Sequence, residues 1–366
     1  MNLAEASADR VMSMDQPVPA PPRGDALVQR WLLCVWALVL AMVIVGGITR
    51  LTESGLSITR WQPIAGILPP LSAEAWQAEL EHYRASPQYR EVNAGMQLAD
   101  FKRIYFWEYV HRLLGRLIGF AVLVPWLIFL ARKRLPASFA WKTAGVFVLG
   151  GLQGALGWYM VKSGLVDEPR VSHFRLAAHL LLAFLVGQLV LWLALDARSA
   201  GPALASRGPT DRVHLRIARA TGALIVLLAL QTLYGAFMAG LRAGYYFGTF
   251  PDMNGYFAPT PFFKAATLAQ NLLSYPPAIH WIHRALAFVV LGSATALWIY
   301  VQRIPALPAV KRAALLLAAV VFLQLNLGAV TVLTRVQLGW AVAHQAVAYL
   351  LLSAATLLLH RALRAV

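Results

Sequence analysis

Two apolar stretches, FWEYVHRLLGRLIGFAVLVPWLIFLA at 106–131 and IHWIHRALAFVVLGSATALWIYV at 279–301, decide the fold of this chain. Each is long enough to cross a bilayer, and each carries a histidine followed by an arginine near its start, at His111 and His283. Ionisable side chains within membrane helices are costly, so they indicate function by default. The repetition of the pattern predicts two similar sites.

A second histidine follows in each half of the chain. The sequence LAAH ends at His179 in the first half, and AVAH ends at His344 in the second. Between the two histidines of each half lies a glutamine with a glycine four residues later, Gln153 in the first half and Gln324 in the second. The two halves therefore carry the same motifs in the same order.

The composition is that of an integral membrane protein. Hydrophobic residues make up 59% of the 366 residues and charged residues only 13%, which a soluble domain rarely shows. A crossing needs roughly 20 apolar residues. Eight such spans are predicted, at 31–48, 106–131, 139–161, 174–195, 217–240, 279–301, 310–333 and 339–359. We therefore predict an all-α integral membrane protein with eight transmembrane helices.

The distribution of charge predicts the orientation. Arginines and lysines gather before the first span and after spans two, four, six and eight, whereas the acids gather in the opposite loops, 49–104 and 241–278. Basic residues mark the cytoplasmic side, so both termini are expected in the cytoplasm of a bacterium, with the chain in its inner membrane. This lipid-facing basic surface explains the net charge of +16. We expect membrane lipid, and no nucleic acid, as a partner.

The spans divide into two groups of four. A disordered cytoplasmic tail (1–29) precedes the first group (30–196), and a cytoplasmic linker (197–216) joins it to the second (217–366). Because each group has an even number of spans, the repeats are predicted to be parallel, related by an axis along the membrane normal. Each should form a four-helix bundle, whose interior can hold a cofactor. In the first outer loop, Ser72 and the acids after it predict a helix lying on the membrane surface.

The four histidines are expected at one level, near the outer face. Each lies in the first two turns of a span that runs from outside to inside. Haem iron accepts two imidazoles from facing helices, so the pairs His111–His179 and His283–His344 predict one haem site per half. The alternative is that the histidines cap or hydrogen-bond neighbouring helices. A zinc site is disfavoured, because zinc needs three or four clustered ligands.

Glu108 marks the clearest chemical difference between the halves. It lies three residues before His111, on the same helix face, where the second half has His280. A carboxylate beside an iron ligand could relay protons or hold a substrate. Alternatively, it could orient the imidazole or pair with an arginine. We expect the chemistry in the acid-bearing half, and the alignment favours His283 over His280 as the ligand.

Three arginines follow the histidines inside apolar helix and need partners there: Arg112, Arg116 and Arg284. Haem propionates are suitable partners, because a guanidinium can bind a carboxylate through two hydrogen bonds. Pairing with Glu108 or with backbone carbonyls is the equally weighted alternative.

The other histidines and the single cysteine are expected to have no chemical role. Cys34 lies in the first span, can form no intramolecular disulfide and is expected to be a small packing residue. The remaining histidines are expected at the surface: His82, His173, His214 and His360.

Several motifs together resemble the haem A synthase family. They are GGITRLTESGLS at 46–57 followed by Trp61-Gln-Pro63, then EYVHR at 108–112, RLAAH at 175–179, IHR at 282–284 and HQ at 344–345. The resemblance covers roughly residues 30–360, nearly the whole chain, and the motifs are specific only in combination. One branch of the family has a cysteine pair in an outer loop. This chain lacks that pair, and so it resembles the proteobacterial and mitochondrial branch.

The resemblance implies an activity and a division of labour. The family oxidises one porphyrin methyl of haem O to a formyl group, by two hydroxylations and loss of water, and supplies haem A to cytochrome oxidase. By resemblance, His111 and His179 bind the substrate haem O, His283 and His344 hold a haem b cofactor, and Glu108 matches the essential glutamate. Haem O synthase, cytochrome oxidase assembly factors and a second copy of the chain are candidate partners. The alternative function is a di-haem membrane electron-transfer cytochrome linked to quinone.

Overall fold

The computed structural model describes residues 25–60, 65–164, 171–198, 209–257 and 262–364, and this part of the chain is almost entirely helical. Eight helices are long and apolar enough to cross a membrane: α2 (Ala26–Leu51), α5 (Leu98–Ala131), α6 (Ala137–Gly164), α7 (His173–Asp196), α8 (Pro209–Gly240), α10 (Pro276–Arg303), α11 (Pro308–Leu333) and α12 (Leu338–Leu363). No β-strand occurs within these ranges. The predicted all-α membrane fold with eight spans is confirmed. Most of the predicted tail and linker, and the motif Trp61–Pro63, lie outside the described residues.

All eight membrane helices begin earlier than the predicted spans, and two of them begin eight residues earlier. Helix α5 starts at Leu98 rather than at residue 106, and α8 starts at Pro209 rather than at 217. The first turns of α5 carry charged residues, so the apolar criterion excluded them, but they also bury Phe101 and Tyr105. These two aromatic side chains pack against other protein segments rather than lipid, so α5 continues beyond its apolar part.

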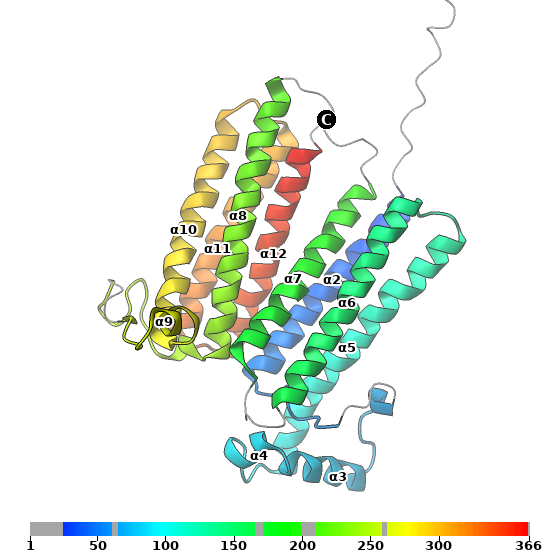
Figure 1. Cartoon of the computed structure of the whole chain (residues 1–366), viewed down its shortest axis with the longest axis vertical. Coiled ribbons are helices and arrows are strands. Elements are labelled where there is room, and N and C mark those ends of the chain that lie inside the picture. Colours follow the sequence, from blue (N-terminus) through cyan, green and yellow to red (C-terminus); the bar gives the residue numbers. More distant parts are fainter. Residues whose placement is uncertain (1–24, 61–64, 165–170, 199–208, 258–261, 365–366) are drawn as a thin grey trace, which may run out of the picture.

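Each half of the chain packs its four long helices into a ring (Figure 1). In the first half the ring runs α2, α5, α6, α7 and back to α2, and in the second it runs α8, α10, α11, α12 and back to α8. Each ring encloses its own cluster of buried apolar side chains. The equal packing order is what parallel repeats would give, and the symmetry axis between them stays a prediction.

The two groups of four helices meet at an interface, called the seam below. It is formed by α2 and α7 on one side and by α8 and α12 on the other. At its centre, Tyr349 is fully buried, with its ring 5.4 Å from that of Phe184. The Tyr349 ring occupies the space that a side chain at Gly187 would need. Glycine at this position therefore lets α7 and α12 approach closely, as small residues do in membrane helix interfaces.

Polar contacts also cross the seam. The Gln345 side chain on α12 donates to the carbonyl oxygen of Val43 on α2 at 2.8 Å. A Cβ at Gly47 would lie only 3.1 Å from Nε2 of that glutamine. Near the end of α2, Glu53 forms an ion pair with Arg242, which follows α8. Apolar packing and polar ties together hold the halves in one relative position.

A layer of short helices covers the histidine-bearing end of the first half (Figure 1). It contains α3 (Ala73–Arg84) and α4 (Pro87–Glu91), and the Ser72 side chain caps α3 by accepting from Ala75 N at 3.2 Å. The predicted loop helix is thus confirmed, but its Leu80 and Tyr83 pack against α5 instead of facing lipid. The second outer loop is mostly irregular, as expected, with η3 (Ala243–Tyr245) and α9 (Leu268–Leu273).

Three minor expectations were wrong. His214 and His360 are buried rather than at the surface, and Cys34 is exposed on α2 rather than packed. His360 lies one turn before the end of α12, where Asp196 of α7 accepts its hydrogen bond at 3.0 Å. Position near a helix end suggested exposure, but the seam between the halves continues to that end.

We predict that both termini and the 132–142 turn lie on the cytoplasmic side, because basic residues concentrate there. Fusions of a reporter that is active only in the periplasm should be inactive at 132–142 and active in the 85–97 loop. A fusion that reports fluorescence only in the cytoplasm should give the opposite pattern. A periplasmic 132–142 turn would overturn the orientation, and with it the placement of the histidines near the outer face.

Candidate functional site

The structure brings the predicted histidines together in two pairs, one inside each ring of helices. In the second half, His283 on α10 faces His344 on α12, with 6.4 Å between the ring centroids and 84° between the ring planes. In the first half, His111 on α5 and His179 on α7 lie close enough to interact electrostatically. All four lie in the half of their helix that is nearer the α3 and α9 end of the molecule.

Each imidazole packs against a glycine on a neighbouring helix. A Cβ at Gly235 of α8 would lie 3.2 Å from Cε1 of His283, and one at Gly46 of α2 would lie 3.3 Å from Nε2 of His111. The other two histidines repeat this contact, with 3.1 Å for Gly157 and His179 and 3.0 Å for Gly328 and His344. A side chain at any of these positions would require the imidazole to move by a few tenths of an ångström, so the glycines allow the rings to lie where they do.

A glutamine one helical turn before three of these glycines holds the adjacent histidine. Gln153 donates to the carbonyl oxygen of His179, and Gln231 donates to that of His283, each at 3.0 Å. Nε2 of Gln324 lies 3.5 Å from Nε2 of His344. The motif at 231–235 was missed in the sequence, although its Q-x-x-x-G spacing matches the other two. The fourth glycine, Gly46, has Met42 instead of a glutamine four residues before it.

The imidazoles have ring nitrogens without protein partners. Nδ1 of His179, His283 and His344 is buried and has no hydrogen-bond partner among the described residues. Backbone carbonyls of Gln231 and Gln324 lie near the last two rings. A buried polar group usually has a partner. These carbonyls are the candidate partners of Nδ1 in His283 and His344, so Nε2 is the nitrogen of each ring that a ligand would use. No group of three or more metal-binding side chains occurs in the described ranges, which does not fit a closed zinc site.

Glu108 is buried and held by three hydrogen bonds, none of which involves His111. Its Oε2 accepts from the Ser57 hydroxyl at 2.7 Å and from Ile58 N at 2.8 Å. Its Oε1 accepts from Arg112 at 2.6 Å. The structure thus places Glu108 between α5 and the segment after α2, and the expectation that it could orient the His111 ring directly finds no contact here.

The second half repeats this arrangement with a different residue. Nε2 of His280, which is fully buried, accepts from Nε of Arg284 at 3.0 Å, one turn later on α10. Arg284 also donates to the Asp252 carbonyl at 2.6 Å, as Arg112 donates to the Ile58 carbonyl at 2.9 Å. In both halves the arginine therefore fastens an outer loop to the helix. Arg112 and Arg284 thus have partners within the protein, which is the alternative to haem propionates given above.

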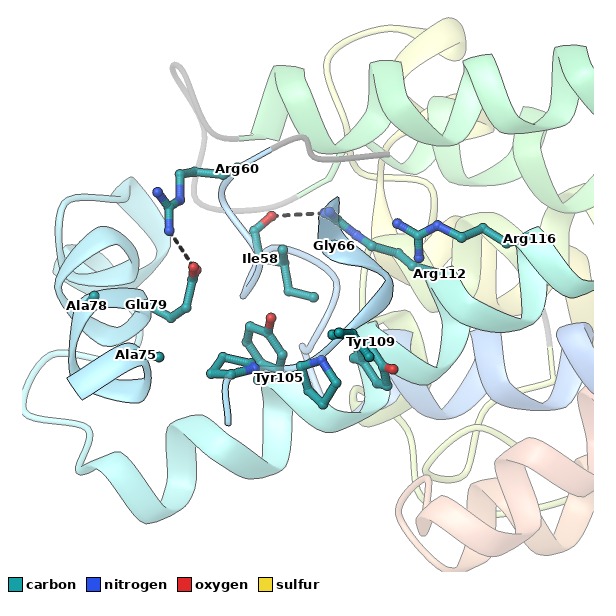
Figure 2. A pocket seen from close by; sticks show the side chains of 13 residues that line it. Ile58, Arg60, Gly66, Ala75, Ala78, Glu79, Tyr105, Tyr109, Arg112 and Arg116 are labelled. Carbon is teal, nitrogen blue, oxygen red and sulfur yellow. Dashed lines mark hydrogen bonds and ion pairs between the residues drawn. The ribbon is translucent and has the colours of Figure 1, made fainter. Parts of the chain in front are cut away.

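A cavity of about 330 Å³ adjoins the first half between α3, α5 and the segment at 66–70 (Figure 2). Three arginines line it, Arg60, Arg112 and Arg116, together with Glu79, which binds Arg60 at 2.5 Å. The Tyr109 hydroxyl closes one side by donating to the Ile67 carbonyl at 2.8 Å. Glu79 is paired with Arg60 and Glu108 with Arg112, so the three arginines exceed these two carboxylates by one positive charge, which favours a ligand that carries negative charge.

Comparison with known proteins finds relatives that match most of this chain. Residues 29–356 match the family model described as "Cytochrome oxidase assembly protein". The "Heme A synthase" of Nitrosospira multiformis is 43% identical over 325 residues, which is 89% of this chain and 90% of that protein. The "Heme A synthase" of Rhizorhabdus wittichii is 44% identical over 343 residues, 93% of this chain and 94% of that protein. By the extent of these matches, the chain belongs to the haem A synthase family.

Proposed function

We propose that this protein is a membrane haem A synthase, an oxidoreductase that converts a methyl group of haem O into the formyl group of haem A for cytochrome oxidase. The family membership and the eight membrane helices support this function. The observation that carries it is the pair of facing imidazoles inside each half. Haem O synthase and cytochrome oxidase assembly factors are the proposed partners, and the bacterial inner membrane is the proposed location.

The second histidine pair fits a haem bound between two helices. The ring centroids of His283 and His344 lie 6.4 Å apart, with 84° between the ring planes, and each ring lies against a glycine of a neighbouring helix. Imidazoles from facing helices are ligands that membrane haems use. His283 and His344 would therefore hold the haem iron in this half.

The two sites are proposed to have different roles. The second half holds haem b as a resident cofactor through His283 and His344, and the first half takes haem O as substrate through His111 and His179. In support, the charged cavity and Glu108 lie in the first half.

The protein's own residues position the substrate and manage charge. Bound haem would supply the redox chemistry. Arg112, with Ser57 and Ile58 N, keeps the Glu108 carboxylate in one place, where it can accept or return a proton at Oε1 or Oε2. Arg116, on the cavity wall, is a candidate partner for a propionate. Oxidation of the methyl carbon releases electrons and protons, so an electron acceptor is required. His283 and His344 would hold the haem that is the proposed relay to that acceptor.

The quinone-linked di-haem cytochrome is the alternative that this proposal must exclude. In such a cytochrome, both haems would be permanently bound and would have equivalent roles. The two halves differ, however, because one carries Glu108 where the other carries His280, and this difference favours unequal roles. Extraction of the pigments from the purified protein, followed by chromatography, separates the two functions. Haem O or haem A together with haem B supports the synthase, whereas haem B alone would contradict it.

Replacement of the histidines should affect the two haems differently. His283→Ala or His344→Ala should deplete haem B, because a resident cofactor depends on both axial bonds. His111→Ala or His179→Ala should leave most haem B in place and abolish conversion of haem O. His82→Ala, at an exposed position on α3, is the control and should change neither. Haem content is read by chromatography, and equal loss of one haem type from all four variants would refute separate sites.

Adding a side chain at a histidine-facing glycine should displace the ring. Gly235→Val should lower the haem B content several-fold, since its Cβ alone would lie 3.2 Å from His283. Gly222→Val, on the same helix with nothing within 4 Å, is the matched control and should retain haem B. In the first half, Gly157→Val should reduce turnover, while Gly154→Val, whose Cβ would also meet open space, should not. Equal behaviour within either pair would show that the glycines do not place the rings.

Glu108 should be required for the oxidation rather than for haem binding. Glu108→Gln keeps the size of the side chain and can still accept from Ser57, but it can neither carry charge nor exchange a proton at the same oxygen. We expect normal haem B with loss of haem A, and accumulation of haem O or of the partly oxidised alcohol.

Glu79→Gln is the matched control for this prediction, because Glu79 is a nearby acid, lining the cavity that Arg112 also lines, and is likewise paired with an arginine. It should retain most of the activity. If Glu108→Gln yields haem A at a near-normal level, the catalytic role is wrong and Glu108 serves only to fasten the loop. A fall in haem B in this variant would point to the same structural role.

A further inference from the structure

A second cavity lies at the opposite end of the molecule from the histidines, on the seam between the halves. Its volume is about 270 Å³, and α2, α7, α11 and α12 contribute to its walls. The polar lining consists of Gln29, Arg198, His360, Arg361 and Arg364. None of these residues belongs to the haem sites described above, and they are drawn from both halves of the chain.

The charges at this cavity do not balance. Asp196 is the carboxylate beside it, and its Oδ1 takes hydrogen bonds from His360 at 3.0 Å and from Arg364 at 2.9 Å. Arg361 donates to the Ala309 carbonyl at 3.0 Å, and Arg198 is exposed. One carboxylate therefore stands against three guanidinium groups, which favours an anion in the cavity.

Asp25, which precedes α2 at the same end of the molecule, does not offset this positive charge. It is paired with Arg134 at 2.7 Å. It does not line the cavity. The positive charge of the cavity therefore remains in excess when both Asp25 and Asp196 are counted.

The remaining walls are apolar. They are formed by Leu195, Leu307, Val310 and Leu357. The cavity lies where membrane-crossing helices end, at α7 and α12, and where α11 begins, which is the depth of lipid headgroups. Basic pockets between membrane helices bind anionic headgroups, and a guanidinium matches the geometry of a phosphate. An apolar wall beside the arginines suits an attached acyl chain, which free phosphate lacks.

We propose that this cavity binds the phosphate group of an anionic phospholipid, with Arg198 and Arg361 as contacts and the acyl chain against the leucines. Arg198 closely follows α7 of the first half, while Arg361 lies on α12 of the second. A bound lipid therefore bridges the two halves on the side where Asp196 already joins α7 to α12. This makes the stability of the seam depend on the lipid composition of the membrane.

The test uses the full chain, purified with its haem in a neutral detergent. Short-chain phosphatidylglycerol, short-chain phosphatidylcholine and glycerol phosphate are titrated in turn. Bound lipid is counted by native mass spectrometry, and the melting temperature is measured in parallel. Phosphatidylglycerol should bind and raise the melting temperature, while phosphatidylcholine and glycerol phosphate should do so weakly or not at all.

Arg198→Gln and Arg361→Gln should each weaken phosphatidylglycerol binding about fivefold. Arg303→Gln removes an exposed arginine at the same end of α10, outside the cavity, and should bind like the unaltered protein. Arg198 makes no described side-chain contact whose loss would unfold the protein, so it tests the site even if Arg361→Gln is unstable. Unchanged haem content verifies folding.

Three outcomes would overturn the proposal. Equal stabilisation by glycerol phosphate would mean a site for free phosphate, and equal binding of phosphatidylcholine would mean that charge is not recognised. Equal weakening by Arg303→Gln would mean a general effect of surface charge.

Discussion

An imidazole inside a membrane-embedded bundle needs room for its ring and a partner for its nitrogens, and both requirements shape this protein. The room comes from a glycine on the neighbouring helix, where an added Cβ would lie 3.0–3.3 Å from the ring in all four cases. Glutamines one turn earlier hold the backbone of His179 and His283. The haem proposed for each half would be the partner on the inward side of the imidazoles.

The outer loops depend on the same helices. In each half, the residue three positions before the first histidine pairs with an arginine one turn later, and that arginine donates to a loop carbonyl. The geometry is shared, while the chemistry differs: Glu108 offers two oxygens that accept hydrogen bonds, and His280 offers one nitrogen. A common scaffold thus carries an acid in one half only, which is how a duplicated fold can separate a reaction site from a cofactor site.

Much of this was predictable from the sequence, because hydrocarbon imposes strong constraints. All eight spans follow from apolar length, and the histidine pairs follow from the repeated motifs. The missed parts depend on contacts between distant segments. The first turns of α5 look too polar for a span but pack on α3. His214 and His360 lie near helix ends yet are buried. The role of Gln231 follows from its contact with His283, a contact between distant parts of the sequence. Whether Arg112 would bind a propionate or Glu108 was undecided, since both partners suit a guanidinium.

The two adjacent glycines of α2 touch both halves at once. Gly46 faces His111, while Gly47 faces Gln345, the residue after His344. The Gln345 side chain on α12 in turn donates to the carbonyl oxygen of Val43 on α2, the helix that carries both glycines. A short chain of contacts through α2 therefore connects His111 with the residue that follows His344. If each half holds the haem proposed for it, the packing of α2 would help to set the distance between the two haems. Electron tunnelling is steeply sensitive to that distance.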